Sequence, residues 1–110
     1  MPMSTTAPGP LTETVFYTLL ALSSPLHGYG IMQYVSELSA GRVNIGAGTL
    51  YAALASLVEK GWIAPLTANA EDRKKQYVIT EAGREVVRRE TARLEELLRN
   101  AHAIAGEGSA

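Results

Sequence analysis

The stretch 46–79 constrains the fold of this chain more than any other part of it. Four of its apolar residues recur at i, i+4, i+7 and i+8, the spacing of one helix face. They are Leu50, Leu54, Leu57 and Val58. Gly61 follows directly and predicts the helix end, because glycine readily adopts the positive φ of a helix C-terminus. Segments 63–68 and 74–79 then predict the two strands of a short hairpin. A helix followed at once by a hairpin is typical of a winged helix-turn-helix.

Two further helices are expected before this stretch. The first covers residues 11–23, with Thr12 as its N-cap. The second begins near His27 and ends at Gly41, and residues 42–45 are expected to hold a very short strand. The predicted buried stripe of the second helix is Ile31, Tyr34, Val35 and Leu38. The expected fold class is therefore mainly α with a small β-hairpin.

A long helix is expected after the hairpin, from Thr80 as N-cap to about Ala105. Gly83 in its first turn predicts close packing against a neighbour. A heptad-like series runs along one face, with steps of 4, 3, 4, 3 and 4 residues. It comprises Val87, Thr91, Leu94, Leu98, Ala101 and Ala105. Since the chain has little of its own to bury this face, we expect a second copy to cover it, with Phe16 of the first helix contributing to the interface.

Composition limits the function classes. The chain has 110 residues, 46% hydrophobic content, a formal net charge of -1 and a pI near 6.1, which fits one small domain and argues against a non-specific polyanion binder. It lacks cysteine, which excludes disulfides and Cys-based zinc sites and fits a cytoplasmic location. No apolar run approaches about 18 residues, so no membrane association is expected. No nucleophile elbow, phosphate loop or metal-ligand cluster is present, so we expect neither an enzyme nor a cofactor.

These expectations divide the chain into four parts. Residues 1–10 are expected to be a disordered tail rich in Pro, Gly, Ser and Thr. Residues 11–80 are expected to form the winged helix-turn-helix domain, and residues 81–105 the dimerisation helix. Residues 106–110 are expected to be a second disordered tail.

Three segments resemble the PadR family of bacterial transcriptional regulators. They are Leu26-His-Gly-Tyr-Gly-Ile, Gly48-Thr-Leu-Tyr with Leu54, Leu57 and Glu59-Lys-Gly after it, and Gln76-Tyr-Val-Ile-Thr-Glu-Ala-Gly-Arg-Glu. Their order and spacing resemble the family over roughly residues 11–98, and the single C-terminal helix resembles its short subgroup. The resemblance implies a homodimeric winged-helix protein that binds double-stranded DNA at a palindromic operator. It also implies a repressor that a small hydrophobic molecule sometimes releases.

The expected DNA-binding residues lie on the third helix and the hairpin. They are Gly48, Thr49, Tyr51, Ala52, Ser56, Lys60, Arg73, Lys74 and Lys75. The helix start suits a phosphate, and the resemblance implies that the Tyr51 hydroxyl contacts another. The family usually has Ser-Pro where Gly46-Ala47 stands here, and tends to have long polar side chains at the positions of Ala52 and Ser56. Base contacts therefore fall to Thr49, Ser56 and a methyl contact from Ala52, so phosphates and DNA shape take a larger share.

Each candidate also has an alternative reading. The whole chain can be a winged-helix module for protein contacts that does not bind DNA, which its acidic pI would suit. Trp62 is expected to pack under the hairpin, and the carboxylates that alternate with arginines after residue 80 are expected to form a solvated face. An aromatic effector would have to stack on Phe16, Tyr17 or Tyr34, because residues 81–110 contain no aromatic residue.

Overall fold

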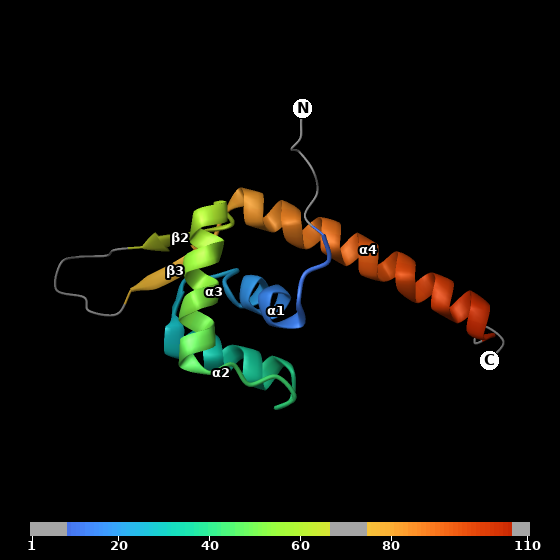
Figure 1. Ribbon diagram of the computed structural model, residues 1–110, viewed down its shortest axis with the longest axis horizontal. Helices are drawn as coiled ribbons and strands as arrows, with labels where there is room; N and C mark the ends of the chain where they lie inside the picture. The colour runs from blue at the N-terminus through green and yellow to red at the C-terminus, as the bar shows by residue number, and fades with distance from the viewer. Residues whose placement is uncertain (1–8, 67–74, 107–110) are drawn as a thin grey trace.

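The computed structural model describes residues 9–66 and 75–106 and has four helices and three short strands within those ranges (Figure 1). In chain order they are α1 Glu13–Ala21, β1 Leu26–His27, α2 Gly28–Leu38, α3 Ala47–Lys60, β2 Ile63–Leu66, β3 Gln76–Ile79 and α4 Glu81–Ala105. The predicted fold class is confirmed: helices dominate, a small antiparallel sheet accompanies them, and a long helix ends the described chain. None of the helices in the described ranges is long and apolar enough to span a membrane.

The core lies where α1, α2 and α3 meet the sheet. Its fully buried apolar side chains include Leu19, Leu22, Ile31, Val35, Leu50, Leu54 and Ile63. The sheet has the order β1-β3-β2, with Leu26 opposite Tyr77 and Ile63 opposite Ile79. The amide of Ile79 also donates to the carbonyl of Leu22 at 2.8 Å, which ties β3 to the end of α1. The hairpin is thus anchored on the helices by both side-chain burial and backbone hydrogen bonding.

The segment 42–45 is not a strand, so that prediction was wrong. Its polar groups bond locally instead: the Val43 amide donates to the Ser39 hydroxyl at 2.9 Å, and the Asn44 side chain donates to the Gly41 carbonyl at 2.8 Å. The third strand is β1, just before α2. Two residues give it no alternation of its own, and it exists because β3 presents a free edge.

The predicted buried face of α2 was half right. Ile31 and Val35 are fully buried, whereas Tyr34 and Leu38 are 43% and 47% exposed. Consecutive helical residues point about 100° apart, so Tyr34 lies well to one side of Val35. Only the centre of the stripe reaches α1 and α3.

The ends of α3 and β3 meet at a tightly bonded junction, formed by Gly61, Trp62, Thr80 and Gly83. Gly61 has φ 80° and ends α3 as predicted. The Thr80 hydroxyl donates to the Gly61 carbonyl at 2.7 Å, and the Thr80 amide donates to the Trp62 carbonyl at 3.0 Å. The same hydroxyl oxygen accepts from the Gly83 amide at 3.1 Å and caps α4, which confirms Thr80 as the N-cap. One threonine therefore closes α3 and opens α4.

Gly83 confirms the predicted close packing. A Cβ built on it would lie 2.1 Å from the Trp62 carbonyl oxygen and 2.7 Å from Cγ1 of Ile79. Both distances are far below van der Waals contact, and the first involves backbone that is already hydrogen-bonded. Only a residue without a side chain lets α4 begin this close to the junction.

We predict that Gly83→Ala lowers the free energy of unfolding by about 2 kcal/mol or more, because the junction must move to admit a methyl group. Gly48→Ala is the matched control: a Cβ there meets nothing within 4 Å. It should be neutral or stabilising by up to about 1 kcal/mol, since alanine favours helix. Urea unfolding at one protein concentration measures both. Equal stability of the two variants would contradict the close packing.

Candidate nucleic-acid interface

The start of α3 offers unpaired backbone donors to solvent. Its first intrahelical hydrogen bond joins the Leu50 amide to the Gly46 carbonyl at 2.9 Å, and Gly46 provides no side-chain cap. The preceding amides of the first turn therefore have no partner within the helix. Gly48 and Thr49 are both exposed there. Their amides and the positive end of the helix dipole suit an anionic group that approaches from outside.

Tyr51 connects α3 to the start of α2. The residue is 51% exposed, yet its hydroxyl lies so near Gly28 that a Cβ built there would come within 2.3 Å of that oxygen. Gly28 is buried and opens α2, which His27 caps by accepting from the Gly30 amide at 3.4 Å. The Tyr51 hydroxyl thus lies against the start of α2. Sequence reasoning did not connect Gly28 with Tyr51, although the glycine in His27-Gly-Tyr-Gly was a signal.

Ala52, Ser56 and Lys60 are exposed on α3, but they do not share one environment. The Lys60 ammonium donates to the Ser56 hydroxyl at 3.3 Å and lies 5.5 Å from the centroid of the Trp62 ring. Ser56 and Lys60 also line a hollow of about 280 Å³ that faces the segment before α1. Ala52 is outside that hollow. Thr49, Ala52 and Ser56 are spaced by three and four residues and share the outer face of α3, while Ser56 and Lys60 also border the hollow.

The hairpin contributes one described basic residue. Lys75 is exposed immediately before β3. The predicted contacts Arg73 and Lys74, and the tip 69–72, lie outside the described residues. Trp62 is half-buried and packs on the core, as expected. The predicted strands 63–68 and 74–79 correspond to Ile63–Leu66 and Gln76–Ile79 in the described part of the chain.

Arg42, between α2 and α3, is engaged elsewhere. Its guanidinium donates to both carboxylate oxygens of Glu13 on α1, with one bond of 3.1 Å. This hydrogen-bonded pair lowers the pKa of Glu13 and raises that of Arg42. Both side chains are more than half exposed, so the pair contributes little to stability.

The outer half of α4 carries an apolar face with nothing from the described chain over it. Figure 1 shows this half extending away from the other helices. Among the predicted interface residues, Phe16 and Val87 are half-buried, Thr91 and Ala101 are exposed, and Leu94 and Leu98 are 40% and 56% exposed. Leu97 and Ile104, which the heptad series did not include, are also exposed. Leu94, Leu97, Leu98 and Ile104 together leave an apolar surface exposed on α4 in the described chain.

A hollow of about 350 Å³ lies where α1 faces α4. Its lining includes Phe16 and Tyr17 of α1 and Leu94 of α4. Two of the three predicted aromatic positions thus border one space beside the apolar face of α4. The third, Tyr34, is on α2 and does not line it.

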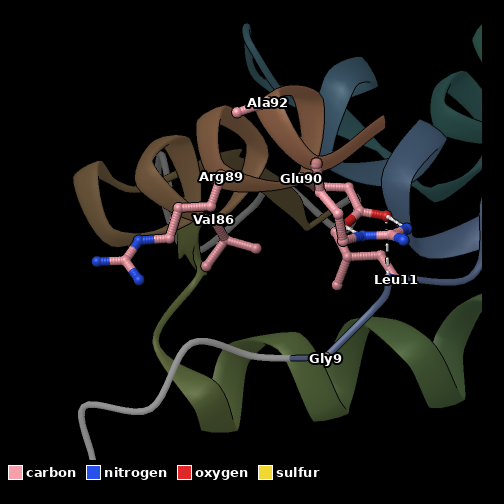
Figure 2. A pocket seen from close by; sticks show the side chains of 7 residues that line it. Gly9, Leu11, Val86, Arg89, Glu90 and Ala92 are labelled. Atoms are coloured by element: carbon pink, nitrogen blue, oxygen red, sulfur yellow. Dashed lines mark hydrogen bonds and ion pairs between the residues drawn. The ribbon is translucent and has the colours of Figure 1, made fainter. Parts of the chain in front are cut away.

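Glu90 is the exception to the solvated face expected on α4. Its side chain is only 6% exposed. Its oxygens accept from Arg93 Nε at 2.8 Å, from Arg93 Nη2 at 2.7 Å and from the Leu11 amide at 3.2 Å (Figure 2). These donors, Arg93 first, hold the pKa of Glu90 below its usual range. The other described carboxylate–arginine pairs of α4, such as Glu85 with Arg89, are exposed as predicted.

A family model described as "Transcriptional regulator PadR-like family" matches residues 18–89. The chain belongs to the PadR-like family. The matched range covers the end of α1, the sheet, α2, α3 and the first part of α4. This PadR-like chain is therefore a member of a family of transcriptional regulators with a winged-helix fold, as the three sequence segments had indicated.

Solved structures support the same fold. A PadR family transcriptional regulator from Eggerthella lenta is 25% identical, with a TM-score of 0.68 over 83% of this chain and 80% of that one. A PadR family regulator from Clostridium difficile has a TM-score of 0.71 at 17% identity, over 86% of this chain and 100% of that one. The hsRosR-S1 complex structure is 26% identical, with a TM-score of 0.63 over 84% and 78% of the two chains.

One curated sequence is also similar. It is an uncharacterized 37.1 kDa protein in transposon TN4556 of Streptomyces fradiae, 41% identical over 66 residues. That match covers 60% of this chain but only 18% of the longer protein.

Proposed function

We propose that this PadR-like chain binds double-stranded DNA as a homodimer and represses transcription at a roughly palindromic operator. The observation that carries the proposal is the exposed start of α3, where Gly48, Thr49 and Ala52 leave the backbone open beside a hairpin that carries Lys75. In a winged helix, a helix so placed enters the major groove while the hairpin contacts the adjacent backbone.

The two elements have different tasks in this proposal. The first-turn amides of α3 and the Tyr51 hydroxyl bind phosphates and set the register of the protein on DNA. Thr49 contacts base edges, and Ala52 contacts a thymine methyl group. Lys75 contacts phosphates, as do Lys74 and Lys60, while Arg73 enters the minor groove where A·T-rich sequence narrows it. Ser56, whose hydroxyl accepts from Lys60, contacts base edges with Thr49.

The homodimer brings two α3 helices to one face of the duplex. The apolar face of α4 is the surface that a second copy would cover, with Phe16 nearby. Two recognition helices would then reach major grooves about 10 base pairs apart. Release by a small hydrophobic effector is part of the proposal, and the hollow beside Phe16 and Tyr17 supports it, because an apolar space at a dimer interface is a common ligand site.

The competing function is a winged-helix module that contacts only proteins. Binding to a selected duplex at low and moderate salt separates the two. The proposal predicts tight binding at low salt, with a log–log salt slope near -5 if the dimer engages on the order of 6 phosphates. Absence of binding at low salt would favour the competing function.

We predict that alanine at Lys75 weakens binding to operator and scrambled duplexes about equally and lowers the salt slope by roughly 1 per lysine lost from each protomer. Thr49→Val should instead change which sequences are preferred, since it removes a hydroxyl from the groove face while keeping the shape. Fluorescence anisotropy titrations on both duplexes measure these effects. Loss of all binding in Thr49→Val beside a silent Lys75→Ala would show that the hairpin is structural only.

We predict that Leu94→Asp with Leu98→Asp yields monomers, because two carboxylates in an apolar interface cost several kcal/mol, roughly 2 or more each. Sedimentation velocity measures the change. Glu96→Gln, a neutralising change on the opposite side of α4, is the control and should leave the dimer intact. A stable dimer in the double variant would mean that another surface holds the protomers together.

A further inference from the structure

The segment 9–12, here called the arm, lies between α3 and α4 (Figure 2). On one side it borders the hollow of about 280 Å³ whose far wall includes Leu57 of α3 and Trp62. On the other side it borders a hollow of about 330 Å³ whose far wall includes Val86 and Glu90 of α4. Leu11 lines both spaces, and its side chain packs on the core. The arm therefore occupies the space between the helix proposed to read DNA and the helix proposed to form the dimer.

One charged group fastens the arm to α4. The Leu11 amide donates to Oε2 of Glu90 at 3.2 Å, and the Arg93 fork holds both oxygens of the same carboxylate in place. Burying a carboxylate costs stability unless it is paired and hydrogen-bonded. The buried Glu90 carboxylate therefore favours the conformation in which Arg93 and the Leu11 amide remain bonded to it. On its other side, Thr12 of the arm caps α1 by accepting from the Val15 amide at 3.1 Å. The arm is thus bonded to two helices and wedged against a third.

We propose that the arm is a strap that couples the position of α4 to that of α3, with Glu90 as the positioning residue that fastens it. When α4 shifts, the Glu90 carboxylate moves away from the Leu11 amide and the strap releases. Leu11 then leaves the space beside Trp62, and α3 loses its support on that flank. The hollows on both sides of the strap give it room to move without disturbing the packed core.

This coupling would give the proposed regulator a route from its dimer helix to its DNA-binding helix. The role of this coupling in regulation rests on the proposed function. The strap itself does not, because it can be tested without DNA. Reciprocity is required: a change beside Trp62 must also loosen the arm at Glu90, since coupling between two sites acts equally in both directions.

The test uses Glu90→Gln, which keeps the shape of the side chain and removes its charge. We expect hydrogen exchange of the Leu11 amide, measured by NMR, to accelerate by about tenfold or more, because its charged acceptor is gone. Acrylamide quenching of Trp62, the only tryptophan in the chain, should rise as well, although Glu90 lies on the far side of the arm. Glu96→Gln, a similar change at an exposed site on α4, should alter neither signal.

Two outcomes would overturn the strap. Unchanged exchange at Leu11 would show that Glu90 does not fasten the arm, and faster exchange with unchanged Trp62 quenching would show that the arm does not reach α3. Should Glu90→Gln fail to fold, Trp62→Phe tests the reverse direction: the strap predicts faster exchange at Leu11, and unchanged exchange would refute it. Both signals are recorded without DNA. A chain that passes them and still binds no duplex would refute the proposed function and support the strap.

Discussion

The arrangement of the whole molecule depends on the backbone contact between Gly83 and Trp62. Here the end of α3, the end of β3 and the start of α4 come together, and Thr80 bonds to two of the three. The contact involves backbone atoms rather than flexible side chains. It therefore fixes both the direction in which α4 leaves the junction and its distance from the end of α3. The hairpin cannot turn relative to α3, nor α4 relative to the hairpin, without breaking it. The two elements proposed to contact DNA are therefore tied together at this junction.

If the junction is fixed, the part of α4 that can change position is its far end. α4 leaves the junction, passes α1 and extends beyond the domain, and Glu90 fastens the arm to it on the way. Helices that begin at one fixed point move most at their far ends, so a dimer that rearranges would act on the arm before it acts on the junction. The proposed regulator would in this way combine a fixed DNA-binding surface with a dimer helix that can move.

Local chemistry made much of this fold predictable. Thr12 and Thr80 cap helices because threonine accepts from the first-turn amides, and Gly61 ends α3 because it adopts positive φ. These effects need only neighbouring residues. Strand β1 could not be predicted in this way, since two residues form a strand only when another strand offers an edge. The buried face of α2 was predicted too wide for the same reason: how much of a stripe is covered depends on the neighbouring helices.

In the candidate site, too, local patterns could be predicted from the sequence, whereas contacts between distant residues could not. Thr49, Ala52 and Ser56 were proposed from the short side chains on the outer face of α3, a pattern visible in the sequence. The pairing of Tyr51 with Gly28 joins residues that are far apart in the chain, and the hydrogen bond from Lys60 to Ser56 depends on rotamers that periodicity does not report. Glu90 looked like its neighbours because alternating charges predict a solvated helix. Its burial depends on the arm, which is distant in sequence and lies against α4.

The most direct test of the central claim is an amide NMR titration of the chain with its best-binding duplex. The proposed DNA-binding surface predicts that the largest chemical-shift changes fall at Thr49, Tyr51 and Ala52 on α3 and at Lys75 beside β3, at the same DNA concentration. Changes confined to α4, with Thr49 and Lys75 unmoved, would contradict it.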